Sequence, residues 1–281
     1  MRYSENAILN KGVNGMKKII RAQLYQICRT SLLRTLLICF IVLSAFFVYS
    51  SWSNGEGITD GIKNGLPVTA GDLIAEQLAI MPTFAMMCAA IVTAYICGDD
   101  FGDKTANYEI MSGSLRKDIY FGRALVSAVA GTVSGVAIML FTVLCCCIAG
   151  AQSSFCIADI LIRILFMGAV FFRMSCFLVM LSYIFKKTVA VLASTYALMC
   201  VISLVGGHAE HSGRYMVSMT SMSYLTVLDS WNTFEVSGAN RMVYETALPA
   251  HTALMVTAVS LIFSALYLIA GYVLFRRDDM R

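Results

Sequence analysis

The sequence is poor in charged residues and in proline. Only 14% of its 281 residues are charged, whereas 58% are hydrophobic. A soluble domain has about 25% charged and about 45–50% apolar residues. The three prolines leave long segments that can form uninterrupted helices. The shortage of charge excludes an ordinary soluble fold and predicts an all-α integral membrane protein.

The ten cysteines include no CxxC pair, and most of them lie within apolar runs. We interpret them as buried thiols that behave as small hydrophobic side chains. His208 and His211 are close in the sequence, but a zinc site needs further ligands at suitable positions, and none is evident. We therefore expect the chain to bind no metal and no other cofactor.

Six apolar runs are each long enough to form a membrane-spanning helix. A span needs roughly 20 predominantly apolar residues, and the candidate runs are residues 35–52, 77–97, 124–150, 157–185, 188–207 and 252–275. Their hydrophobicity is continuous rather than alternating, which favours helices over a β-barrel. The sequence thus predicts an N-terminal segment, residues 1–30, and a six-helix transmembrane domain over residues 31–281.

The basic residues are distributed unevenly between the two ends of these predicted spans. Sixteen of the 21 lysines and arginines precede the first span, follow the last, or lie in the second-to-third connection, residues 98–123, and the fourth-to-fifth turn. The other connections, including residues 208–251, contain three. Because lysine and arginine accumulate on the cytoplasmic side of a membrane, we expect cytoplasmic termini and an extracellular 208–251 segment. The net charge of +4 is then a topology signal and gives no support to nucleic-acid binding.

The N-terminal segment has a helical pattern just before the first span. Apolar residues recur at helical spacing among basic ones, namely Ile20, Leu24, Ile27 and Cys28. This pattern predicts a helix that lies along the inner membrane surface with its apolar side toward lipid. The alternative is a simple basic anchor for the first span. We expect the residues before Met16 to be disordered or not translated.

The charged segment 98–123 contains glycines followed by Lys104 and Thr105, but it does not form a phosphate-binding loop. The motif GxxxxGK[ST] requires its second glycine where this chain has Asp103. A carboxylate at that position repels phosphate, and the segment follows an apolar span rather than a strand. We therefore expect no ATP site in this chain. The segment forms either short helices that dock on a partner or a solvated loop.

Residues of this segment resemble the cytoplasmic loop of the type-2 ABC exporter permeases. In that family the loop often reads E-F-x-x-G-T-I-K-N-L-L-S-x-G-x-S-R-x-x-I-Y-x-x-K. The matching residues here are Asp100, Phe101, Thr105, Asn107, Ser112, Gly113, Arg116, Ile119, Tyr120 and Arg123. Lys104 and Leu115 depart from the pattern. The six predicted spans, the amphipathic N-terminus and the long last outer loop are also similar to that family.

The resemblance implies a permease subunit of a bacterial plasma membrane. Two copies, identical or related, would form an export path within the membrane lipid. Separate ATP-binding-cassette ATPase subunits, which use ATP and Mg²⁺, would dock on loop 98–123, so the chain itself would not be an enzyme. The coupling residues would be Asp100, Phe101, Thr105, Glu109, Arg116 and Tyr120. An amphipathic peptide or drug-like substrate is expected; the alternatives are a stand-alone secondary transporter or channel and an intramembrane hydrolase.

Two arginines interrupt the fourth predicted span. Arg173 is near its middle, where an arginine costs about 2.5–3.5 kcal/mol on insertion scales. Arg173 either lines the translocation path or forms structural hydrogen bonds with helix carbonyls. Arg163 lies nearer the outer end, four residues after Asp159, and we expect these two residues to form a structural ion pair.

The third predicted span carries Ser127, Gly131 and Gly135 at four-residue spacing. Small residues in this pattern allow two helices to approach closely. We expect these residues to pack the third span against a neighbouring helix.

Overall fold

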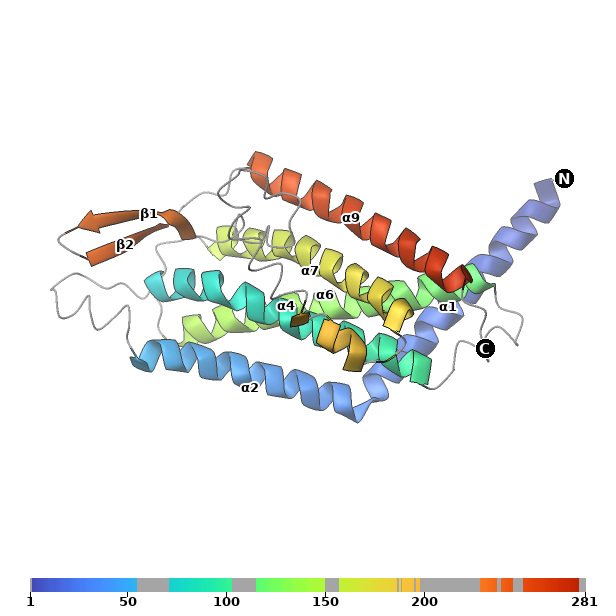
Figure 1. Ribbon diagram of the computed structural model, residues 1–281, viewed down its shortest axis with the longest axis horizontal. Helices are drawn as coiled ribbons and strands as arrows, with labels where there is room; N and C mark the ends of the chain where they lie inside the picture. The colour runs from blue at the N-terminus through green and yellow to red at the C-terminus, as the bar shows by residue number, and fades with distance from the viewer. Residues whose placement is uncertain are drawn as a thin grey trace.

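A computed structural model describes residues 2–54, 71–102, 115–149, 157–185, 187, 189–194, 196–197, 228–236, 239–244 and 250–277. Its long elements are helices α1 (Arg2–Arg29), α2 (Ser31–Asn54), α4 (Gly71–Gly102), α6 (Arg116–Ile148), α7 (Ile157–Phe185) and α9 (Ala250–Arg277), and strands β1 (Leu228–Val236) and β2 (Ala239–Tyr244). Helices α2, α4, α6, α7 and α9 run along a common direction, and α1 projects obliquely from one end of this bundle (Figure 1).

Five of the described helices are long and apolar enough to cross a membrane. Their apolar parts are Ser31–Ser50, Met81–Gly98, Arg116–Ile148, Ile157–Phe185 and Ala253–Arg277, with mean hydropathies between 1.6 and 2.3. They coincide with five of the six predicted runs, so the chain is a multi-pass α-helical membrane protein. Of the remaining run, residues 188–207, the structure describes only 189–194 and 196–197, which are helical.

Helices α7 and α9 are joined by residues of which the structure describes only a part. Helix α7 ends near α1, whereas α9 begins at the opposite end of the bundle (Figure 1). The sixth span in residues 188–207 stays a prediction.

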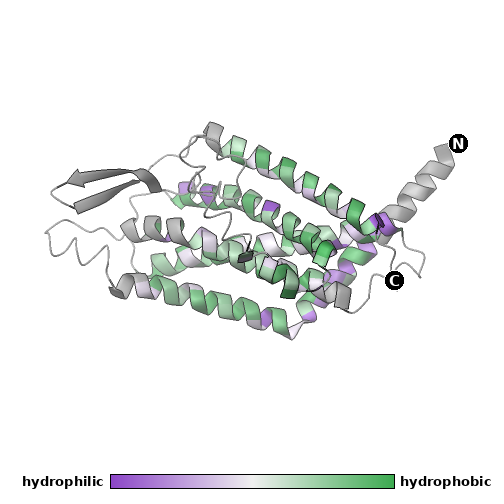
Figure 2. Ribbon diagram, viewed as in Figure 1, coloured by the Kyte–Doolittle hydropathy of each residue, from purple (hydrophilic) through white to green (hydrophobic). Residues whose placement is uncertain are grey.

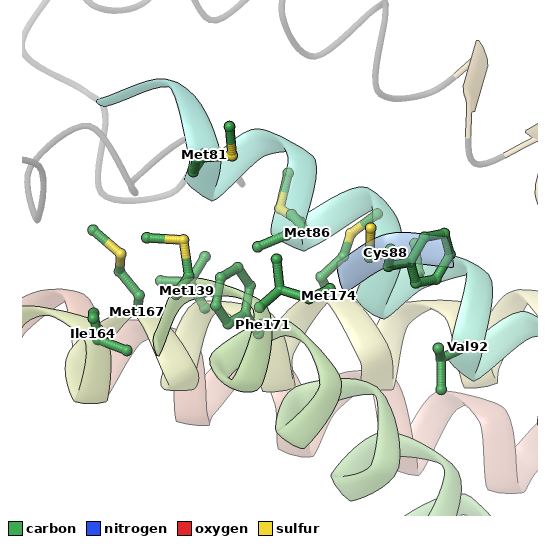
Figure 3. Close-up of a cluster of buried hydrophobic side chains, with 14 of the residues drawn as sticks. Met81, Met86, Cys88, Val92, Met139, Ile164, Met167, Phe171 and Met174 are labelled. Atoms are coloured by element: carbon green, nitrogen blue, oxygen red, sulfur yellow. The ribbon is translucent and has the colours of Figure 1, made fainter. Parts of the chain in front are cut away.

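Helix α4 forms the centre of the bundle. In its most apolar part 72% of the residues are buried, compared with 22% in α2 and in α9. It packs against α2, α6 and α7, and α7 in turn packs against α6 and α9. The core between α4, α6 and α7 is rich in sulfur (Figure 3), because Met81, Met86, Cys88, Met139, Met167 and Met174 belong to the same buried cluster as Phe171. Unbranched, polarisable methionine side chains fill irregular gaps between helices.

Strands β1 and β2 form a two-stranded ribbon outside the helical bundle, which the sequence analysis did not predict. They pair antiparallel from Leu228 opposite Tyr244 to Val236 opposite Ala239, with an irregular register between Asp229 and Thr233. The β1 segment, LDSWNTFEV, is rich in the aromatic and β-branched residues that favour strands. The ribbon lies at the end of the bundle opposite α1 (Figure 1).

Basic side chains gather at the end of the bundle where α1 lies, which we call the basic end. They belong to α1, to the first turns of α2 and α6, and to the last turn of α9: Lys17, Lys18, Arg21, Arg29, Arg34, Arg116, Lys117, Arg276 and Arg277. Figure 2 shows hydrophilic residues on α1 and on the adjoining end of α9, whereas the helices between the two ends are largely hydrophobic. We call the other end, which carries β1 and β2, the ribbon end.

Helix α1 is one long helix that packs against the bundle along one face. It begins at Arg2 and is continuous to Arg29, whereas the sequence predicted residues before Met16 that are disordered or not translated. Its buried residues include Ile19 and Gln23, whereas Leu24 and Cys28, which were expected on the side toward lipid, are exposed. The helix therefore has one face for the bundle and a second apolar strip that is free to contact lipid.

Candidate functional site

The residues expected to contact an ATPase are located where α4 ends and α6 begins. Asp100 and Phe101 belong to the last turn of α4, and Arg116 is the exposed first residue of α6. Both helix ends lie at the basic end (Figure 1). Thr105 and Glu109 are outside the described residues. The connection is shorter than the predicted 98–123, because both helices extend into that range.

Tyr120 lies inside the bundle and not on a surface that a partner can reach. Its side chain is 0% exposed, and its hydroxyl donates a hydrogen bond of 2.8 Å to the carbonyl oxygen of Leu268 in α9. Its ring centroid is 5.1 Å from that of Tyr183, 5.6 Å from that of Tyr272 and 5.7 Å from that of Phe275. This placement corrects the expectation of a docking residue: the third span begins at Arg116 rather than at residue 124, so Tyr120 holds α6 to α7 and α9.

Gly271 allows this close packing, although the sequence analysis did not select it. A Cβ atom at position 271 would overlap the Tyr120 hydroxyl oxygen and would lie 3.4 Å from Cα of Met180 in α7. Glycine, which has no side chain, allows α9 to approach both α6 and α7 this closely. The helical glycine in an apolar run was the available signal, but its partner is 151 positions away along the chain.

Ser127, Gly131 and Gly135 lie on the face of α6 that meets α4 and α7. A Cβ at Gly131 would overlap Oγ1 of Thr93 and would lie 2.7 Å from Oγ of Ser175. A Cβ at Gly135 would lie 3.1 Å from the Phe171 ring. The structure therefore places both glycines where neighbouring helices approach too closely for a larger residue. Ser127 is fully buried, and its hydroxyl donates to the carbonyl oxygen of Arg123, one turn earlier in α6.

Arg173 lies between α7 and α9 and is 2% exposed. Its guanidinium carbon is 4.5 Å from the centroid of the Phe263 ring, and the guanidinium also interacts with the side chain of Tyr267. The Tyr267 ring is in turn 5.1 Å from the ring of Phe177. An aromatic surface and a hydroxyl together replace part of the hydration that the charge loses on burial. The structure thus adds an explanation that the sequence did not offer: Arg173 connects α7 to α9 through aromatic side chains.

Arg163 is buried as completely as Arg173. Its side chain is 1% exposed, although it lies near the outer end of the fourth predicted span; its expected ion pair with Asp159 stays a prediction. Helix α7 therefore carries two buried cations, one near each end of its central part. The sequence identified both arginines but did not predict that Arg163 faces the bundle. Helix α7 has apolar residues on every face, so its sequence does not indicate which face is buried.

No protein-family model matches the sequence, and no curated protein shows significant similarity to it. The functional interpretation therefore depends on three observations about the chain itself. These are the residues of the α4–α6 connection, the concentration of basic residues at one end, and the packing of the buried helix α4 along α6.

Proposed function

We propose that the protein is the membrane permease subunit of an ABC exporter that moves an amphipathic substrate, a peptide or a drug-like molecule, outward. A separate ATPase subunit would dock at the basic end on the connection between α4 and α6 and would hydrolyse ATP with Mg²⁺. The basic end and both termini would face the cytoplasm of a bacterium, in agreement with the tendency of lysine and arginine to remain inside.

The observation that carries this proposal is the identity of the two helices joined by the docking segment. Helix α4 is the most buried span, and it packs along α6. A force applied to the connection is therefore transmitted to α4, the most buried span, and to α6, which packs against α1, α2, α4, α7 and α9. Long helices packed without voids move as rigid elements, so closure of an ATPase at the basic end would shift the interior of the bundle.

In this proposal a second permease copy, identical or related, completes the path. The described chain has exposed apolar faces on α2 and α9, since only 22% of the residues in the most apolar part of each helix are buried. These faces are available to membrane lipid or to another membrane subunit. Arg173 would reach the path only if α7 and α9 separate, because its guanidinium lies against Phe263 and Tyr267 of α9 in this conformation.

The proposal is tested by purifying the tagged full chain in mild detergent from the cells that produce it naturally. We expect an ATPase subunit with a phosphate-binding loop at equal stoichiometry. Arg116→Ala should reduce its co-purification about fivefold, the effect of roughly 1 kcal/mol expected for a partly exposed charge contact. Arg241→Ala in β2 is the matched control at the ribbon end and should have no effect. Full ATP hydrolysis by the chain without any partner would contradict the proposal.

A further inference from the structure

A groove opens at the basic end where α1, α6 and α9 meet. It has a volume of about 290 Å³ and is lined by Met16 of α1, by Lys117, Asp118, Phe121 and Leu125 of α6, and by Leu268 of α9. Four of these six side chains are apolar, and the two charged ones are adjacent at the start of α6. The volume is near the lower limit for ligand pockets, which suits part of a flexible apolar chain rather than a whole globular ligand.

The floor and one wall of the groove are held by specific contacts. The Phe121 ring stacks on the ring of Tyr272 in α9, with 5.4 Å between centroids and 28° between planes. On the α1 side, a Cβ at Gly122 would lie 3.2 Å from Cγ2 of Ile19, so α1 lies directly on α6. The groove therefore follows from helix packing and does not depend on a mobile side chain.

The groove runs from a charged rim into the apolar part of the bundle. Lys117 and Leu125 are eight residues apart in α6, which corresponds to roughly 12 Å along the helix axis at 1.5 Å per residue. Phe121 and Leu125 are 37% and 40% exposed. An occupant must consequently have a polar group at the level of Lys117 and an apolar portion at the level of Leu125.

The charge at the rim favours an anion. Exposed Lys17 and Lys18 follow Met16 in α1, and exposed Arg276 and Arg277 end α9, one turn after Tyr272. Asp118 is the one acidic residue among the groove-lining side chains, and it opposes part of this positive charge. Asp278 and Asp279 follow α9 in the sequence and are outside the described residues.

We propose that this groove binds one anionic phospholipid of the membrane leaflet at the basic end. Its acyl chain lies along Phe121, Leu125 and Leu268, and its phosphate is near Lys117 and the lysines of α1. The lipid fills the wedge between α1 and the bundle and so fixes the angle at which α1 leaves α6. This proposal depends on insertion of the helices in a membrane and is independent of the proposed ATPase.

The experiment measures binding of lipid to the full chain, purified and delipidated in detergent. Phosphatidylglycerol and phosphatidylcholine with the same acyl chains are added, and bound lipid is counted by native mass spectrometry. We expect saturable binding of one phosphatidylglycerol with a several-fold preference over phosphatidylcholine. Lys117→Gln should weaken it about fivefold, the contribution of one lysine at an anionic surface. Lys187→Gln, an exposed lysine outside the groove lining, should leave it unchanged.

A second pair of variants tests the apolar part of the groove. Leu125→Trp fills the groove and should abolish the saturable binding, whereas Val133→Trp, at an exposed position two turns further along α6, should not. Thermal unfolding of each variant, with and without phosphatidylglycerol, shows whether a variant is folded and whether lipid still stabilises it. Equal binding of both lipids, or equal binding by all four variants, would overturn the proposal. Lipid-independent dimerisation that Leu125→Trp abolishes would assign the groove to a second copy and would also overturn it.

Discussion

Removal of the aromatic ring next to Arg173 should destabilise the bundle more than the loss of apolar contact alone. Phe263→Leu deletes the ring centred 4.5 Å from the guanidinium carbon and keeps a hydrophobic side chain. A cation–π contact is worth about 0.5–1 kcal/mol at an exposed site and about 2 kcal/mol when desolvated, and Arg173 is buried. We therefore expect about 2 kcal/mol of destabilisation from this contact, added to the ordinary packing cost.

The comparison with Arg173→Met separates the contact from packing. Methionine carries no charge, so the Arg173→Met variant has no buried cation that loses its partner when Phe263 is replaced. Replacing a buried ionic group by an apolar one is often neutral or stabilising. In the Arg173→Met background, Phe263→Leu should thus cost only its packing contribution. The coupling energy in the double-mutant cycle should be about 1–2 kcal/mol.

The assay is equilibrium unfolding in mixed micelles of the four proteins in the cycle. Arg163→Met combined with Phe263→Leu is the control cycle, because Arg163 lies ten residues earlier in α7, roughly 15 Å away along the helix. Additivity within about 0.5 kcal/mol in the Arg173 cycle would refute the connection between α7 and α9. Transport normalised to folded protein, measured on Arg173→Met, then distinguishes a role in the translocation path from a purely structural role. An unchanged transport rate would show that Arg173 does not line the path.

Three further outcomes follow from the helix contacts and the charge distribution. Gly131→Ala should destabilise the bundle by about 1–3 kcal/mol through overpacking. Gly168→Ala should be nearly neutral, because its Cβ meets only Val136 Cγ2 at 3.4 Å. Equal unfolding free energies of the two variants would contradict the close packing at Gly131. Gly271→Ala should be destabilising in the native background and should be rescued by Tyr120→Phe, which removes the overlapping hydroxyl oxygen; a lack of rescue in the same unfolding assay would exclude this contact. Reporter fusions placed between β1 and β2 and at the C-terminus should report opposite sides of the membrane, and matching accessibility would overturn the six-span topology.

The helices could be predicted from the sequence because hydrophobic length alone specifies a span. Five of the six apolar runs correspond to α2, α4, α6, α7 and α9, and the largest difference is the start of α6, which is Arg116 rather than residue 124. Lipid and protein interior are equally apolar, however, so the sequence of a span does not show which face is buried. This is why the central position of α4 and the inward position of Arg163 could not be predicted.

The candidate site was predicted only in part, for a related reason. The segment around Arg116 was selected by its charge and its motif, and Arg116 is indeed exposed at a helix end. Tyr120, four residues later, is buried by contacts with Tyr183 and Phe275, which come from helices distant in the sequence. A local motif predicts neither where a helix begins nor which of its residues another helix covers. The β1–β2 ribbon was missed although its aromatic and β-branched residues favour strands.

The proposed docking of an ATPase on the α4–α6 connection is tested most directly by photocrosslinking in living cells. A photoreactive amino acid is placed at Arg116, and the same residue at Asn240 in β2 serves as the control at the ribbon end. The account predicts an ultraviolet-dependent adduct at position 116 with a protein that carries a phosphate-binding loop, and no such adduct at position 240. Active transport by cells that yield no adduct with an ATPase at position 116 would contradict the account.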